Sequence, residues 1–419
     1  MGWTAGTTVS AMSSTGEAPD KIAAVADRAD VLQWRGKTAG EADARAEVVE
    51  LLRAAGPGRD VALVRALGDL AAVRTELDQW DEAIVAADEA AALSRTLDPA
   101  VRVDALIYQM VVLRKAGRLE SAAAVAAELI GLLRGSDAAA VPDGDGWLAV
   151  SLNDLASLSF NLGWHQQTAA PITEAIEIYR RLVDADPDRY RDGLGMACHN
   201  AATIFGEAGQ LDRALDASGE GIRTGRRLVE RDPVAGPPRL LEALLDHVTY
   251  LVRANRHAEG LPLGHEAVAL ARRLDARADL ALALGLLFDM PADLGQDAEA
   301  LGAVAEAVEV FRRLADPDAA AYSSAANNLG FALMAAGRHE ESLAATAEAV
   351  AAGRRAAVGE LALALWTFAE VRVAAGTELP EALAAIDESV ALYRSADLPA
   401  EVAGAAAMKA EVETALASR

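Results

Sequence analysis

NNLGFALMAAGRHEESLAATAEAV, running from Asn327 to Val350, is the stretch of sequence that decides the fold. Apolar residues recur at helical spacing on both sides of Gly337, which predicts two amphipathic helices joined by a turn at that glycine. Two other stretches align with it, NDLASLSFNLGWHQQTAAPITEAI from Asn153 to Ile176 and HNAATIFGEAGQLDRALDASGEGI from His199 to Ile222. The sequence therefore predicts a repeated helix–turn–helix unit.

The turn position repeats along most of the chain. Gly, Asn and Asp fill it, and these residue types suit a helix end that enters the left-handed conformation. Successive copies lie 39 to 46 residues apart, which indicates a repeat array rather than several unrelated domains. The turn residues are Asp78, Gly117, Gly163, Gly209, Asn255, Gly295, Gly337 and Gly376.

Two further features recur in the second helix of each copy. A small residue, in most copies followed by a branched apolar one, comes twelve or thirteen residues after the turn, and it allows the two helices to approach closely. Many second helices then end in a pair of arginines, which we interpret as complementing the helix dipole. The first pairs are Ala90-Ala91, Leu129-Ile130, Ala175-Ile176, Gly221-Ile222, Ala267-Val268, Ala307-Val308, Ala349-Val350 and Ser389-Val390; the arginines are Arg180-Arg181, Arg226-Arg227, Arg272-Arg273, Arg312-Arg313 and Arg354-Arg355.

Composition excludes several classes of function. The 419 residues carry a net charge of −24, which opposes binding to nucleic acid or to an anionic membrane surface. Aromatic residues make up only 4% of the chain, so thin layers of closely packed helices suit it better than one thick core. Cys198 is the single cysteine, which leaves no intrachain disulfide or cysteine metal cluster and favours a cytoplasmic location.

The expected organisation is a disordered tail over residues 1–18, a helical hairpin over 19–58, a solenoid over 59–397 and a capping helix over 398–419. Pro291 falls inside the first helix of the sixth copy, where it should kink or shorten that helix. The predicted fold is all-α, a right-handed superhelix of about eight hairpins flanked by the N-terminal hairpin and the C-terminal cap.

These repeats resemble tetratricopeptide repeats. The similarity rests on Leu-Gly or Leu-Ala pairs in the first helix, such as Leu329-Gly330 and Leu155-Ala156, on the turn glycine and on small residues in the second helix. The period is longer than the common 34 residues and is similar to the kinesin-light-chain-like variety. The array also resembles the sensor part of actinobacterial-type signalling ATPases, whose ATPase module would have to act in trans.

The resemblance implies that the first helices line a concave groove that binds a peptide. The inward positions lie ten, six, three and two residues before each turn, and polar residues recur there at matched depth. We expect this groove to hold Asn153, Ser157, Asn161, His199, Thr203, Glu207, Thr249, Arg253, Asn327, Phe331 and Trp366. Amide and hydroxyl groups would bond an extended segment, while Phe331 and Trp366 would anchor apolar side chains.

The predicted function is a non-enzymatic scaffold or regulator that captures a protein or peptide, with a cationic partner favoured by the acidic field. Two alternatives stay open: a small-molecule or signal-peptide receptor that regulates a partner in trans, and an enzyme that uses His199, Glu207 and Arg253. No catalytic, cofactor-binding or metal-binding motif is expected. Gly36-Lys37-Thr38 lacks the earlier glycine and the preceding strand of a phosphate-binding loop. The sequence leaves the identity of the partner and the oligomeric state open.

Overall fold

The structure, a computed structural model, describes residues 18–36, 38–135, 138–293 and 297–418. Within these ranges every regular element is helical and there is no strand, which confirms the all-α fold. The chain divides into two compact units, Met1–Ile204 and Phe205–Arg419. The predicted tail lies outside the described residues except for Ala18, the first residue of helix α1.

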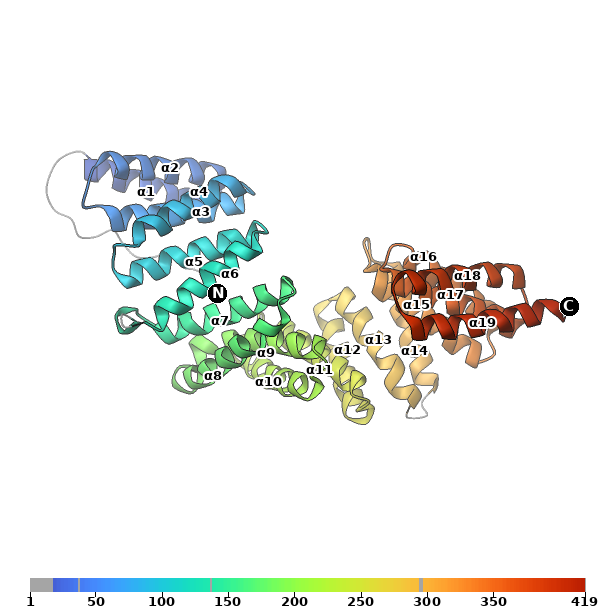
Figure 1. Cartoon of the computed structure of the whole chain (residues 1–419). Coiled ribbons are helices and arrows are strands. Elements are labelled where there is room, and N and C mark those ends of the chain that lie inside the picture. Colours follow the sequence, from blue (N-terminus) through green and yellow to red (C-terminus); the bar gives the residue numbers. More distant parts are fainter. Residues whose placement is uncertain (1–17, 37, 136–137, 294–296, 419) are drawn as a thin grey trace. The chain divides into compact units, whose positions relative to one another are not determined.

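Helices follow one another along both units as antiparallel hairpins (Figure 1). The first unit contains α1 (Ala18–Trp34), α2 (Thr38–Ala54), α3 (Asp60–Glu76), α4 (Trp80–Ser94), α5 (Pro99–Lys115), α6 (Leu119–Leu133), η1 (Ala138–Ala140), α7 (Gly144–Asn161), η2 (His165–Gln167) and α8 (Ala169–Ala185). Helix α9 (Pro187–Glu207) crosses the division. The second unit continues with α10 (Leu211–Arg231), α11 (Gly236–Arg253), α12 (His257–Leu274), α13 (Arg277–Asp293), α14 (Asp297–Arg312), α15 (Ala319–Ala335), α16 (His339–Gly353), α17 (Val358–Ala375), α18 (Leu379–Ser395) and α19 (Pro399–Ala417).

The predicted turn residues set the register of the hairpins. Asp78, Gly117, Gly163, Gly209, Asn255, Gly337 and Gly376 all have a positive φ, between 57° and 73°, whereas Gly295 lies outside the described residues. At Gly337 the backbone closes as a Schellman turn, because Arg338 N donates to Leu333 O at 2.8 Å and Gly337 N donates to Met334 O at 2.9 Å. The expected turn position is therefore confirmed wherever the structure describes it.

Close approach between the helices of a hairpin explains the small residues. Ala90, Ala175, Ala267, Ala307 and Ala349 are completely buried. At Gly330 a Cβ atom would lie 2.4 Å from Thr346 Cγ2 on the facing helix α16, so no larger residue fits there without a shift. The cores are thin layers built largely from alanine, leucine and valine, as the low aromatic content indicated.

Within each unit the first helices of the hairpins form one row and the second helices form another. Several neighbouring first helices contact each other directly, α3 with α5 in the first unit and α11 with α13 and α15 with α17 in the second. Second helices are instead joined by long side chains. A glutamate and, six residues later, an arginine recur at every second helix, and in the pairs named below the arginine of one helix binds the glutamate of the next.

We call these links the arginine–glutamate ladder. In the first unit they are Arg53–Glu89 and Arg134–Glu174; in the second they are Arg226–Glu266, Arg272–Glu306, Arg312–Glu348 and Arg354–Glu388. In each of the four links of the second unit, the arginine is the first residue of a predicted arginine pair. It binds a carboxylate on the next repeat, in addition to complementing the helix dipole as we expected.

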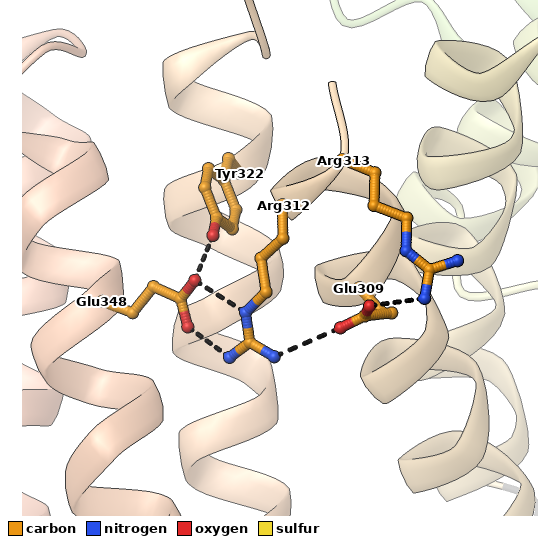
Figure 2. Close-up of polar contacts among 5 residues, drawn as sticks. All are labelled: Glu309, Arg312, Arg313, Tyr322 and Glu348. Atoms are coloured by element: carbon orange, nitrogen blue, oxygen red, sulfur yellow. Dashed lines mark hydrogen bonds and ion pairs between the residues drawn. The ribbon is translucent and has the colours of Figure 1, made fainter. Parts of the chain in front are cut away.

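Figure 2 shows the link between α14 and α16. Arg312 Nη2 donates to Glu348 Oε2 at 2.6 Å and Arg312 Nε donates to Glu348 Oε1 at 3.0 Å, which makes the pair bidentate. The Tyr322 hydroxyl on α15 also donates to Glu348. The second arginine of the pair, Arg313, directly follows α14 and binds Glu309 of that helix, which also lies 3.5 Å from Arg312. The Arg312 and Tyr322 contacts hold the pKa of Glu348 below its usual value.

Helix α13 runs to Asp293, two residues beyond Pro291. It ends two residues before its turn position, as α7, α11 and α15 do, so the proline does not shorten it. At the end of the chain α19 packs against α17 and α18. No helix among the described residues combines the length and the apolar character needed to span a bilayer.

Candidate functional site

The predicted groove residues fall into two sets, because the division of the chain passes through α9. Asn153, Ser157, Asn161, His199 and Thr203 belong to the first unit, and Glu207, Thr249, Arg253, Asn327, Phe331 and Trp366 belong to the second. Each set lies on first helices, and each is described within its own unit.

A polar row crosses the first helices of the first unit. Asn200 Nδ2 on α9 donates to Asn153 Oδ1 on α7 at 2.9 Å, so the two helices are joined through their amides. Asn153 is buried and Asn200 is half-buried. Beside them, burial raises the pKa of Asp154, and the Arg114 guanidinium of α5 acts in the opposite direction. The same row reappears between α3 and α5, where Tyr108 is hydrogen-bonded to Asp69.

The other predicted residues of the first unit extend this row. Ser157 is half-buried and Asn161 is exposed at the end of α7. Thr203 is half-buried, and its hydroxyl donates to His199 O at 3.3 Å within α9. The amide of Asn161 is thus the most accessible of the predicted groups in this unit.

In the second unit several predicted side chains are engaged by the protein itself. Arg253 Nη2 donates to Gly206 O at 2.8 Å, and Arg253 Nη1 lies 3.5 Å from Glu207 Oε1. The Thr249 hydroxyl donates to Leu245 O at 2.8 Å in its own helix. Arg253 and Glu207 therefore link α11 to the end of α9.

The three predicted residues nearest the C-terminus differ from one another. Asn327 is buried, and its Oδ1 is a buried acceptor that finds no hydrogen-bond partner among the described residues. Phe331, four residues after Asn327 on α15, is 48% exposed. Trp366 is half-buried and packs against α19, where a Cβ on Gly404 would lie 2.4 Å from its ring, and it meets Tyr393 edge to face. Its packing gives Trp366 a structural role, whereas Phe331 has the free surface that an anchor needs.

Two candidate functional residues, Asp154 and Asn200, were not predicted from the sequence. Both lie nine residues before the turn, one position after the column that we counted as inward, and Asp69 and Tyr108 occupy the same column. The recurrence of polar residues nine before the turn was the signal that could have identified them.

The cysteine, three turn histidines and the Gly36-Lys37-Thr38 fragment show no sign of a catalytic or binding site among the described residues. Cys198, the single cysteine of the sequence, is buried. Three histidines come two residues after a turn residue: His257 is buried, whereas His165 and His339 are exposed. Gly36 follows helix α1, not a strand, and Lys37 lies outside the described residues. In the described part of the chain, no group of three or more His, Cys, Asp or Glu could hold a metal ion.

Comparison with known families finds tetratricopeptide-type repeats. Residues 323–360 match a family model described as tetratricopeptide repeat. Residues 53–116, 129–186 and 241–326 match one described as anaphase-promoting complex subunit 5. No curated protein matches the sequence.

Solved structures share the helical-repeat fold at low sequence identity. A signal transduction ATPase with numerous domains and a tetratricopeptide repeat sensor, from Pyrococcus horikoshii, aligns with a TM-score of 0.56 and 12% identity over 87% of this chain and 55% of that chain. RapI in its apo form aligns with a TM-score of 0.51 and 9% identity over 85% of this chain and 99% of that chain. BtubC (BKLC) from P. vanneervenii is 20% identical over 56% of this chain and 92% of that chain, with a TM-score of 0.47.

Proposed function

Because the chain is built from tetratricopeptide-type repeats, we propose that it is a non-enzymatic scaffold or regulator that captures an extended, cationic protein segment on the first helices of its N-terminal unit. The segment lies along the polar row that runs from α3 to α9. Side-chain amides and carboxylates bond its backbone and its basic side chains.

One observation carries the proposal, the amide bridge from Asn200 to Asn153 across two neighbouring first helices. A cross-helix bridge fixes the spacing of polar groups along the face, and fixed donors and acceptors lose less conformational entropy when a peptide binds. Ser157 and Asn161 continue the same helix face toward the turn, and Ser157 is half-buried while Asn161 is exposed.

The charges of the row favour a cationic segment. Burial raises the pKa of three carboxyls on these helices, Asp69, Asp104 and Asp154. An arginine of the chain, Arg45, Arg65 or Arg114, already acts against the burial at each carboxyl, and a lysine or arginine of the segment would add to that compensation. The net charge of −24 adds a long-range attraction for the same kind of partner.

The fold relatives support a recruiting role. The Pyrococcus horikoshii protein carries its repeats as a sensor. In the present chain the same architecture would leave any catalytic step to the captured partner. The cytoplasmic location expected from the single cysteine is part of this proposal.

Affinity capture from extract of the native cell, with bound proteins identified by mass spectrometry, tests it. The variant replaces Ser157, Asn161 and Asn200 by alanine, and loss of three hydrogen bonds at about 1 kcal/mol each should weaken capture by about 100-fold. The matched control replaces Glu177 and Arg181, exposed on α8, by alanine and should capture the partner like the wild type. Equal enrichment by the triple variant and the control would refute a first-helix binding face.

A further inference from the structure

The arginine–glutamate ladder is broken at one place in the first unit. Arg95 occupies the ladder position at the end of α4, and the glutamate that should receive it is Glu128 on α6. Instead, Arg102 on α5 donates to Glu128 at 2.6 Å. Six of the other hairpins carry leucine at the position of Arg102, and one carries Tyr322. In this copy Glu128 therefore pairs with Arg102 of the same hairpin, and the exposed Arg95 has no ion pair among the described residues.

A cavity of about 300 Å³ lies at the same break. It opens between α4, α5 and α6, and Arg95 and Glu128 are both in its wall. Ala91 is also in the wall, at the position where the other seven copies have isoleucine or valine. The missing branched side chain contributes to the space, because an isoleucine at this position would fill part of the layer between the helices.

The remaining wall defines the chemistry of an occupant. Gln109 Nε2 donates to Asp88 Oδ1 at 2.7 Å, which orients that carboxylate at the rim. Val125 supplies an apolar surface beside Ala91. The cavity thus offers a cation at Arg95, an anion at Asp88 and an apolar patch at Ala91 and Val125.

We propose that this cavity binds a free branched-chain α-amino acid. The carboxylate of the ligand pairs with Arg95, its ammonium group with Asp88, and its aliphatic side chain fills the space above Ala91. A zwitterion has no net charge, so it approaches a protein of charge −24 without repulsion, unlike a simple aliphatic carboxylate. The volume is at the lower end for ligand pockets, which suits an amino acid better than a larger metabolite.

Bound in this place, the ligand would complete the ladder between α4 and α6. It would stiffen the row of second helices in the first unit, whose first helices carry the proposed binding face. The concentration of the amino acid would thereby affect partner capture. Binding to the cavity does not require the proposed partner site to exist, because the two sites use different helix faces and different residues.

Isothermal titration calorimetry of the full chain tests the proposal with leucine, isoleucine and valine. We expect saturable binding, and at least tenfold weaker binding of 4-methylpentanoate, which lacks the ammonium group, of isopentylamine, which lacks the carboxylate, and of glycine, which lacks the side chain. Absence of leucine binding at about 10 mM, roughly ten times the upper end of the usual KM range for enzyme substrates, would overturn the proposal. Equal binding of isopentylamine or glycine would also overturn it.

Two variants separate the site from general stability. Ala91→Ile supplies the side chain found in other copies, so it should abolish leucine binding while the melting temperature stays the same or rises. Arg95→Gln should weaken binding at least tenfold. Arg394→Gln, which changes the exposed ladder arginine of α18 in the other unit, is the control and should bind leucine like the wild type. Wild-type affinity in both Ala91→Ile and Arg95→Gln would contradict the assignment.

Discussion

Breaking the ladder link between Arg312 and Glu348 should loosen α16 measurably. The pair is half-exposed, with 47% of the Arg312 side chain and 25% of the Glu348 side chain accessible. Exposed ion pairs stabilise by about 0.2–1 kcal/mol, and the bidentate geometry together with the Tyr322 hydroxyl places this one at the upper end. We therefore expect Glu348→Gln to cost about 1 kcal/mol, and a double-mutant cycle with Arg312→Ala to give a coupling of about 0.5–1 kcal/mol.

Native-state hydrogen exchange read by mass spectrometry is the suitable assay, because a repeat array opens in segments and a single global free energy is poorly defined. A loss of 1 kcal/mol corresponds to about fivefold faster exchange in α16. The matched control is Glu341→Gln, which removes the exposed partner of Arg338 at the start of α16, leaves Arg312 and Glu348 untouched and should cost about 0.3–0.5 kcal/mol. A coupling between Arg312 and Glu348 that is no larger than that control would refute the view that the ladder holds the second helices together.

The pH dependence has a definite sign. The folded state lowers the pKa of Glu348 below its ordinary value of 4.5, so its stabilisation is present above that pH and is lost as the pH falls through the lowered value. The difference between the wild type and Glu348→Gln should accordingly shrink on acidification below about pH 4.5. A difference that grows in acid would show that Glu348 is not paired as described.

Three further substitutions test other parts of the structure. Gly330→Ala should destabilise α15–α16 by about 1–3 kcal/mol, because its Cβ would meet Thr346, and Thr346→Ser in the same chain should restore much of the loss; urea unfolding of both variants checks this. Asp154→Asn should stabilise the first unit at neutral pH, because burial raises the pKa of Asp154 and so disfavours its charged form in the folded state. In acid the Asp154 carboxyl is neutral, so the gain in melting temperature should vanish when the two proteins are compared across pH. Asp78→Gly should stabilise the α3–α4 turn by about 0.5–1 kcal/mol in the same melting assay, because φ is 57° there; a loss of stability would mean that the aspartate side chain is needed.

The repeat register could be predicted from the sequence because backbone geometry restricts its marker residues. A left-handed helix end favours glycine, asparagine or aspartate, so the turn column is visible in a single sequence and the structure confirms its described members. The ladder was just as regular, a glutamate followed six residues later by an arginine. We did not predict its pairing because the partner lies 34 to 40 residues away and the adjacent arginine suggested a dipole explanation.

The binding face was less predictable, since a helix turns by about 100° per residue and a column error of one position changes which side chains face outward. Asn153 was placed in the groove, yet its amide joins α7 to α9, and Asn200 beside it was missed. Trp366 has its ring covered by α19, a contact that depends on Gly404 at the end of the chain and has no counterpart in the repeat pattern. Such contacts arise from how helices pack, which one repeat's sequence does not specify.

The central claim, that the first helices of the N-terminal unit bind a partner, is tested most directly by hydrogen exchange on the captured complex. Our account predicts that the partner protects α7 and α9 around Ser157, Asn161 and Asn200, and that α8 shows no comparable change. Protection confined to second helices, with exchange in α7 and α9 unchanged, would contradict it.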